Sequence, residues 1–217
     1  MLEAKKSPDL LYFENKAHDL GYRLVAGVDE SGRGPLAGPV VASAVILRDT
    51  SFDHPIRDSK KLSAKQREAA FEEIFDKAYV GVGVMNERVI DAHNILNASF
   101  FAMDNAVSQM LDHLPPEISV KKDVKKELAL LIDGNRFKTS LPFPCKTIVK
   151  GDSLSLSISC ASIIAKVVRD RIVTIYDRIF PQYGFKKHKG YPTKGHREAI
   201  KTHGPSMIHR RSFKWLP

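Results

Sequence analysis

Short apolar runs of strand length constrain the fold of this chain more than any other feature. The first two, residues 24–29 and 40–47, are rich in small and β-branched residues, a composition that favours buried strands. The connection between them, residues 31–39, is rich in glycine and proline and predicts a tight loop. Each run is far shorter than the roughly 18 apolar residues that a membrane-spanning helix needs, so we expect no membrane partner.

The rest of the chain alternates between helical and strand patterns. Apolar residues at helical spacing predict helices at residues 7–21, 63–77, 86–113, 158–180 and 193–202, and further apolar runs predict strands at 79–85, 128–133 and 146–149. Residues 117–126 are polar and predict a surface connection. This order favours an α/β fold, in which a mixed β-sheet is flanked by helices and followed by a small helical C-terminal appendage.

The domain organisation follows from what the sequence lacks. It has neither an internal repeat nor a low-complexity linker, which predicts one domain over residues 1–217. We expect a catalytic core at about residues 22–180 and a basic helical segment at about 181–217. A monomer is the default expectation.

Positive charge is concentrated at the C-terminal end. The chain has a net charge of +9, and residues 186–217 alone carry +8, which leaves +1 for the residues before them. A basic surface gains affinity for a nucleic acid by releasing the counterions of its phosphates. Charge alone, however, also fits a basic tail without a specific role.

The two cysteines, Cys145 and Cys160, are too few for a scaffold of several disulfides. The first residues carry scattered charges and no apolar stretch, so they do not form a secretory signal. We therefore expect reduced thiols that pack in the interior of a cytoplasmic protein.

Acidic residues stand where apolar strands end. Asp29 and Glu30 end the first run, Asp133 ends the run 128–133, and Asp152 precedes the long helix. One such acid is often only a helix cap or a member of an ion pair. Several that meet would repel one another, and a divalent cation would compensate them. Carboxylates without a His or Cys cluster suit Mg²⁺ or Mn²⁺, and two such ions about 3.5–4 Å apart commonly cleave phosphodiesters.

The glycine-rich loop after Asp29 is not a nucleotide-binding fingerprint. Its glycines, Gly32, Gly34 and Gly38, have the spacing G-x-G-x-x-x-G, and a strand follows where a dinucleotide site needs a helix. A P-loop is excluded because no Gly-Lys-Ser/Thr follows. The loop leaves little bulk around Arg33, so its backbone can approach a ligand. A plain glycine-rich hairpin is the alternative.

Seven motifs, in this order, resemble bacterial ribonuclease HII. They are GVDESGRGPLAGPVVASAVIL, DSKKLS, HNILNAS, LLIDGNR, KGDSLSLSISCASIIAKVVRD, HKGYPTKGH and GPSMIHRRSF, and they span about residues 22–213. The resemblance implies a ribonuclease H-like fold and endonucleolytic cleavage of RNA in RNA–DNA hybrids. It also implies nicking at single ribonucleotides in duplex DNA, on their 5′ side, to give 3′-hydroxyl and 5′-phosphate ends.

The resemblance also implies roles for individual residues. Asp29, Glu30, Asp133 and Asp152 match the family's catalytic acids, which hold Mn²⁺ or Mg²⁺. By analogy Asp29 would bridge two ions, and the ion held by each other acid stays open.

Substrate contacts are implied as well. The Gly32-Arg33-Gly34 loop would contact the ribonucleotide and its 2′-hydroxyl, the group that distinguishes RNA from DNA. Tyr191 would stack on the sugar of the following nucleotide. Lys60, Lys61 and Asn94, the last with Asn97, either hold backbone phosphates or belong to a solvated loop and a helix cap.

Other positions carry weaker expectations. Lys166 and Arg169 share a helix face beside Asp170, which favours a structural ion pair. Four C-terminal histidines, His188, His196, His203 and His209, lack a metal-ligand spacing, and we expect most of them to face solvent or phosphates. Ser31 and Cys160 stand where the family usually has Ala, and Gly195 stands where it often has an acid, a difference that concerns substrate positioning.

Two other functions compete with this reading. Ribonuclease HIII has similar chemistry and a weaker preference for the isolated ribonucleotide, but it usually carries an additional N-terminal domain. With its first catalytic acid at position 29 the chain is expected to lack that domain. A non-catalytic nucleic-acid-binding module would explain the basic C-terminal segment but not the four acids, which oppose phosphate binding unless metals intervene.

Overall fold

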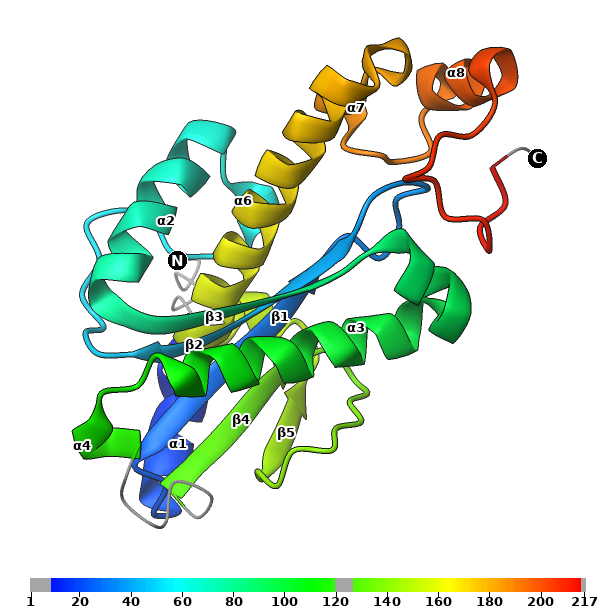
Figure 1. Ribbon diagram of the computed structural model, residues 1–217. Coiled ribbons are helices and arrows are strands. Elements are labelled where there is room, and N and C mark those ends of the chain that lie inside the picture. Colours follow the sequence, from blue (N-terminus) through cyan, green and yellow to red (C-terminus); the bar gives the residue numbers. More distant parts are fainter. Residues whose placement is uncertain (1–8, 120–126, 216–217) are drawn as a thin grey trace, which may run out of the picture.

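The computed structural model describes residues 9–119 and 127–215 (Figure 1). Its sheet contains β1 (Leu24–Ser31), β2 (Val40–Leu47), β3 (Ala78–Met85), β4 (Leu128–Asp133) and β5 (Cys145–Ile148). The main helices are α1 (Tyr12–Asp19), α2 (Ala64–Lys77), α3 (Glu87–Asp112), α6 (Leu156–Ile179) and α8 (Lys194–His203). Short turns of helix are α4 (Pro116–Ser119), α7 (Phe185–His188), η1 (Ser59–Lys61), η2 (Gly151–Ser153) and η3 (Pro181–Tyr183).

The sheet is mixed, as predicted, with the strand order β3-β2-β1-β4-β5. β2 is antiparallel to both β1 and β3, whereas β4 is parallel to both β1 and β5. The pairing of β1 with β4 aligns Val28 with Ile132. Both strands therefore end at the same edge of the sheet, where Asp29 and Asp133 are the next residues.

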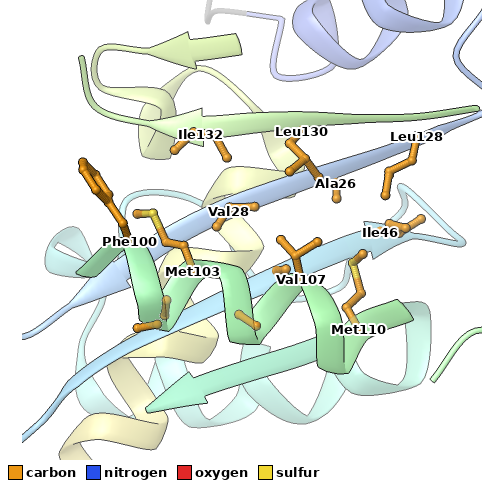
Figure 2. Close-up of a cluster of buried hydrophobic side chains, with 14 of the residues drawn as sticks. Ala26, Val28, Ile46, Phe100, Met103, Val107, Met110, Leu128, Leu130 and Ile132 are labelled. Carbon is orange, nitrogen blue, oxygen red and sulfur yellow. The ribbon is translucent and has the colours of Figure 1, made fainter. Parts of the chain in front are cut away.

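Helices cover both faces of the sheet: α3 lies on one, and α6, with α1 and α2, lies on the other (Figure 1). Side chains of a strand alternate between the two faces. Ala26 and Val28 accordingly pack with Met103 and Val107 of α3, as Figure 2 shows. Val25, on the opposite face, packs against α1 and α6. The same alternation sends Asp29 to the α6 side and Glu30 to the α3 side.

The start of α6 lies directly against β1. A Cβ on Gly27 would stand only 2.2 Å from the carbonyl carbon of Ser157, so only glycine allows this approach. From α1, the buried Glu14 reaches the same place, and its Oε1 accepts hydrogen bonds from Ser155 Oγ (2.6 Å), Ser157 Oγ (2.7 Å) and Ser157 N (2.9 Å). Ser155 is also the N-cap of α6. Glu14 therefore fixes where α6 begins.

The C-terminal appendage is bound to the glycine-rich loop between β1 and β2. Leu36 N donates to Gly190 O (2.8 Å), Gly38 N donates to Ile208 O (2.8 Å) and Arg210 N donates to Leu36 O (2.9 Å). Leu36 also packs in an apolar cluster with residues of α6, α7 and α8. The loop and the C-terminal segment therefore form one packed unit at the upper right of Figure 1.

Several boundaries differ from the predictions. α1 begins at Tyr12, and residues 7 and 8 of the predicted first helix lie outside the described residues, as do residues 120–126 of the predicted surface connection. The short α7 was not predicted, because four residues are too few to show a helical period. Cys160 is buried as expected, but Cys145 is exposed, because it begins the edge strand β5. No helix in the described part of the chain has the length and apolar character to cross a membrane.

Replacing Glu14 should loosen the start of α6. In Glu14→Ala the hydroxyls of Ser155 and Ser157 and the backbone N–H of Ser157 lose their acceptor. This loss should lower the free energy of unfolding by about 2–3 kcal/mol. Urea unfolding at pH 7 measures it. Glu198→Ala, at an exposed acid of α8, is the matched control and should stay within about 0.5 kcal/mol. Equal stability of the two variants would contradict this account.

Candidate active site

Three separate segments bring the four predicted acids to one edge of the sheet. Asp29 and Glu30 end β1, Asp133 ends β4, and Asp152 lies in η2. η2 is bound to the end of β4, because Asp133 Oδ1 accepts hydrogen bonds from the backbone N–H groups of Gly151 (2.7 Å) and Asp152 (3.4 Å). The acids thus meet through strand pairing and a short loop contact.

The pKa values show that these carboxylates interact. Burial raises the pKa of Asp29 well above its usual range, and repulsion from Glu30 and Asp133 raises it further. Burial also raises the pKa of Glu30, against the opposing charge of Arg33, whose Nη1 lies 3.3 Å from Glu30 Oε1. The pKa of Asp152 is raised by burial and by Asp133. Negative charge is therefore costly here unless cations compensate it.

The donor set fits a hard divalent cation. It consists of carboxylate oxygens that are partly or fully buried, which is the chemistry preferred by Mg²⁺ and Mn²⁺. Within residues 9–119 and 127–215, no three His, Cys, Asp or Glu side chains converge as a ready-made metal site. Carboxylates repel one another and stay apart when no cation is bound. The raised pKa values of Asp29, Glu30 and Asp152 therefore indicate that this set of acids suits a cation.

Two serines that the sequence analysis did not single out support Asp29. The Ser162 hydroxyl on α6 lies beside Asp29 and lowers the pKa of its carboxyl against the larger effect of burial. Its Oγ also lies 2.9 Å from Ser59 Oγ, and both serines are buried. These hydroxyls connect η1 to the site. The only sequence signal was the serine-rich run KGDSLSLSISCAS, which does not tell which hydroxyl faces β1.

The basic residues of η1 are placed differently from each other. Lys60 Nζ lies 3.8 Å from Asp152 Oδ2, at the acids, and neighbouring carboxylates, Asp152 foremost, raise its pKa despite the opposing effect of burial. Lys61 Nζ instead lies 3.8 Å from Asp58 Oδ2. Lys60 is thus the η1 lysine positioned beside the candidate metal ligands.

Asn94 has a local structural role. It interrupts α3 with a φ of 62°, and its Oδ1 accepts a hydrogen bond from Asn97 N at 3.1 Å. The helix-cap reading is therefore confirmed, and the contact with a phosphate stays a prediction.

A cavity of about 250 Å³ beside the acids is lined by Glu30, Arg33 and Arg136, among others. It gives the acid cluster an open side with two arginines.

The glycine-rich loop and Tyr191, far apart in the sequence, lie side by side. A Cβ on Gly34 would stand 3.5 Å from the Tyr191 ring, and one on Gly32 would collide with the Arg169 side chain at 2.2 Å. The Tyr191 ring is 41% exposed, and its centre lies 6.0 Å from the Arg169 guanidinium carbon. The structure thus unites the two predicted sugar-contacting elements on one surface.

The predicted ion pair on α6 is half right. Lys166 Nζ does pair with Asp170 at 2.8 Å. Arg169 is instead fully buried and donates to the carbonyl oxygens of Pro39 (3.0 Å), Lys189 (3.1 Å) and Ala37 (3.3 Å). Residues 166 and 170 are four apart and share a helix face, whereas Arg169 is directed at the glycine-rich loop.

Arg210 completes this arrangement, and the sequence analysis missed it. It is fully buried and donates to four carbonyl oxygens of the loop, those of Gly32 (2.6 Å), Arg33 (3.0 Å), Gly38 (3.0 Å) and Pro39 (3.2 Å). Burial, with the nearby Arg169, lowers its pKa to about 9. Arg169 and Arg210 therefore hold the loop through its carbonyl oxygens. The acids precede this loop in β1, and Tyr191 lies beside it at Gly34.

The expectation that most C-terminal histidines face solvent or phosphates is wrong for two of them. His196 and His209 are buried, and their Nε2 atoms lie 3.1 Å apart. His188 is half-buried and stacks on His196 with ring centres 4.3 Å apart, while His203 is exposed. Aromatic neighbours, including Phe185, enclose the buried pair. Such burial depends on chain packing that no local pattern reports.

The fold and the site first define a class, the ribonucleases H. The fold is similar to that of the ribonuclease H2 from Pyrococcus horikoshii OT3, with a TM-score of 0.65 and 26% identity over 88% of this chain and 94% of that one. It is also similar to Bst-RNase HIII in complex with Mn²⁺, with a TM-score of 0.62, 19% identity and coverage of 91% and 69%. The second likeness concerns the fold alone.

The family follows from the sequence comparisons. Residues 26–216 match the family model for Ribonuclease HII. The Ribonuclease HII of Syntrophus aciditrophicus is 54% identical over 205 residues, which are 94% of this chain and 90% of the relative. The chain therefore belongs to the ribonuclease HII family, and the resemblance seen in its motifs is confirmed. It is a ribonuclease H, a hydrolase that cuts RNA within RNA–DNA hybrids endonucleolytically, from a family that uses divalent metal ions.

The buried histidines should make stability depend on pH. Burial lowers the pKa of both His196 and His209 from the usual 6.5 to about 4, so their uncharged forms stabilise the fold fully above about pH 6.5. That stability is lost as the pH falls toward 4, because the unfolded chain then binds more protons. Each unit of pKa shift corresponds to about 1.4 kcal/mol.

Urea unfolding of the wild type and His209→Gln at pH 7.5 and pH 5 measures this effect. The stability advantage of the wild type should shrink at pH 5 by about 1–3 kcal/mol. The same substitution at the exposed His203 controls for removal of a surface histidine. An advantage that stays constant between the two pH values would show that His209 does not contribute in this way.

Loss of the Arg210 hydrogen bonds should loosen the glycine-rich loop. Lys at this position cannot reach four carbonyl oxygens with one ammonium group, so Arg210→Lys should lower the free energy of unfolding by about 1–3 kcal/mol and reduce hybrid cleavage. Arg211→Lys is the matched control, because Arg211 is adjacent and exposed. Thermal unfolding and a cleavage assay test both variants, and indistinguishable behaviour would refute the role of Arg210.

Proposed function

We propose that this protein nicks DNA duplexes on the 5′ side of single embedded ribonucleotides, in addition to cutting the RNA strand of hybrids, and does so with two divalent metal ions. Asp29, Glu30, Asp133 and Asp152 would hold the ions. Water would add to the phosphorus, and the bond to the preceding 3′ oxygen would break. That oxygen leaves with a proton as a 3′-hydroxyl, and the phosphate stays on the 5′ side of the ribonucleotide.

One observation carries this proposal: the acid cluster adjoins a loop whose backbone is open to a sugar. The Gly32-Arg33-Gly34 loop follows the acids after Ser31 and lies beside the exposed Tyr191. A backbone without side-chain bulk can donate and accept hydrogen bonds at a 2′-hydroxyl, the group that marks a ribonucleotide. The loop would therefore hold the sugar next to the acids that would hold the phosphate.

The residues of the chain would divide the work. Metal ions, when bound, supply activation of the attacking water and stabilisation of the leaving oxygen. The loop 32–34 would read the ribonucleotide, and Tyr191 would stack on the next sugar. Lys60, at 3.8 Å from Asp152, would hold a phosphate near the ligands, and Lys61 and Asn94 would contact phosphates further out.

A ribonuclease HIII-like enzyme that cuts only continuous hybrids is the remaining alternative. Family membership favours the type 2 reading, and the loop–Tyr191 contact supports recognition of an isolated ribonucleotide. A non-catalytic binding module is no longer an alternative for a ribonuclease H.

We further propose that residues 1–217 act as one domain and as a monomer in the cytoplasm.

Asp29→Asn should abolish cleavage without loss of the fold. Since removal of even a residue that only orients a metal ligand costs about 10–100-fold, loss of the bridging carboxylate should lower turnover at least about 100-fold. The assay uses an end-labelled DNA duplex with one ribonucleotide, with Mg²⁺, with Mn²⁺ or with EDTA. Asp112→Asn, an exposed acid at the end of α3, and an all-DNA duplex are controls. Undiminished turnover of Asp29→Asn would sink the proposed site.

Tyr191→Ala should weaken single-ribonucleotide cleavage more than it weakens binding. Aromatic stacking on nucleotides contributes about 1–3 kcal/mol, which corresponds to a loss of roughly 5- to 150-fold in kcat/KM. Tyr12→Ala removes a similarly exposed tyrosine on α1 and should cleave like the wild type. Cleavage rates on the single-ribonucleotide duplex and on a continuous hybrid measure selectivity. An unchanged ratio of the two rates would refute the stacking role.

A further inference from the structure

A buried pair of histidines connects the C-terminal segment to the backbone of Tyr191. His209 Nδ1 lies 2.9 Å from Ser206 N, His209 Nε2 lies 3.1 Å from His196 Nε2, and His196 Nδ1 lies 2.9 Å from Tyr191 O. All four ring nitrogens of the pair thus have a partner. Both histidines are at most 2% exposed, so water does not substitute for these contacts.

The two ends of this chain of hydrogen bonds fix its direction. The Tyr191 carbonyl only accepts, so His196 Nδ1 carries a proton and donates it. In the uncharged ring, His196 Nε2 then carries none and accepts the proton of His209 Nε2. His209 Nδ1 is left without a proton and accepts from the Ser206 N–H and from the Ser206 hydroxyl, whose Oγ lies 2.8 Å away. The pair therefore has opposite tautomers and no net charge.

The surroundings favour this uncharged state. An added proton would put two N–H groups face to face at 3.1 Å or set one against Ser206 N–H. The charged groups nearby, Arg197 and the stacked His188 when protonated, would repel a cation as well. Burial lowers the pKa of both histidines to about 4, in agreement with this geometry.

The Tyr191 backbone is held at both of its polar groups. Its N–H donates to His188 O at 2.9 Å, and its carbonyl accepts from Thr193 N at 2.8 Å as well as from His196. Tyr191 is, by contrast, 41% exposed, and its ring lies near the loop at Gly34 and 6.0 Å from the Arg169 guanidinium carbon. The ring therefore takes its direction largely from the backbone, to which His196 contributes one of three hydrogen bonds.

We propose that His196 and His209 are positioning residues for Tyr191, and that their oppositely protonated, uncharged pair sets the angle at which its ring meets the sugar. This inference rests on the proposed role of Tyr191 at the isolated ribonucleotide. Its consequence is selective. The sugar that Tyr191 would stack on follows the ribonucleotide, so it is a deoxyribose at a single ribonucleotide and a ribose in a continuous hybrid. The single site offers no second 2′-hydroxyl to hold that sugar, and it therefore depends more on the angle of the ring.

Two substitutions at His196 separate its two hydrogen bonds. The amide nitrogen of Asn can take the place of Nδ1, so His196→Asn keeps a donor for Tyr191 O. The longer Gln reaches the place of Nε2, so His196→Gln keeps the link to His209 and loses the one to Tyr191. Loss of one such bond corresponds to about 5- to 10-fold. His196→Gln should lower kcat/KM on the single-ribonucleotide duplex by that factor more than on a continuous hybrid, and His196→Asn should keep most of the wild-type ratio.

The ratio between the two substrates separates positioning from general damage, which would lower both rates alike. Equal losses on both substrates, or a wild-type ratio in His196→Gln, would overturn the proposal. Tyr191→Ala is assayed beside these variants. If it keeps the wild-type ratio, the role of Tyr191 itself is wrong. If it loses selectivity while His196→Gln retains it, only the positioning role of the histidines is wrong.

A measurement on the wild-type protein does not depend on the folding of any variant. Long-range ¹H–¹⁵N NMR spectra at pH 7 report which ring nitrogen carries the proton. The expected result is an Nδ1–H tautomer for His196 and an Nε2–H tautomer for His209. The reverse assignment, or a doubly protonated ring, would overturn the proposal.

Discussion

The parallel pairing of β1 with β4 is the constraint on which the rest of this structure depends. Residues more than 100 positions apart are brought into register at the centre of the sheet, so that both strands end together at Asp29 and Asp133. Antiparallel pairing would send these acids to opposite edges. The chain passes from β2 through β3 and α3 to β4, which places α3 over one face of the sheet. α6 covers the other face, and η2, just before α6, brings Asp152 to the same edge. A site of four acids thus follows from one choice of strand direction.

The molecule keeps each kind of buried polar group by a different means. The acids are buried without enough counter-charge, which raises the pKa of Asp29 and calls for a cation. Arg169 and Arg210 form no salt bridge within the described residues and instead donate to the carbonyl oxygens of the loop, so their cost of burial is offset by hydrogen bonds to backbone dipoles. His196 and His209 avoid the cost by staying uncharged. Only the acids lack enough opposite charge within the protein itself. A metal ion would supply that charge, so metal-dependent chemistry is expected at the acids.

What the sequence predicted depended on local patterns. Apolar runs located all five strands to within two residues, because a buried strand differs from its flanks in composition, and the position of Asp29 at a strand end followed from the same pattern. The contacts that shape the substrate surface were not predictable in this way. In the sequence Arg210 looks like one more basic residue of a charged segment, but in the fold it donates to the Gly32 carbonyl oxygen. His209 likewise looks like a surface histidine, but Phe185 packs against it. In each case the partner lies far away in the sequence, and no local period reports it.

The same reasoning explains why the C-terminal segment is more than a basic surface. It supplies Arg210 to the glycine-rich loop and His209 to the histidine pair, and it places Tyr191, the residue proposed to stack on a sugar, beside Gly34, so three of its residues lie in one small region beside the acids. Glu14 has a comparable place at the other end of the chain, outside residues 26–216 that match the family model, where it sets the start of α6. The acids themselves depend on the central sheet and on η2, which is bound to the end of β4. Selectivity requires that the sheet, the loop and the C-terminal segment hold fixed positions relative to one another, and the buried arginines provide that connection. Substrate preference should therefore be more sensitive than metal binding to changes in the C-terminal segment.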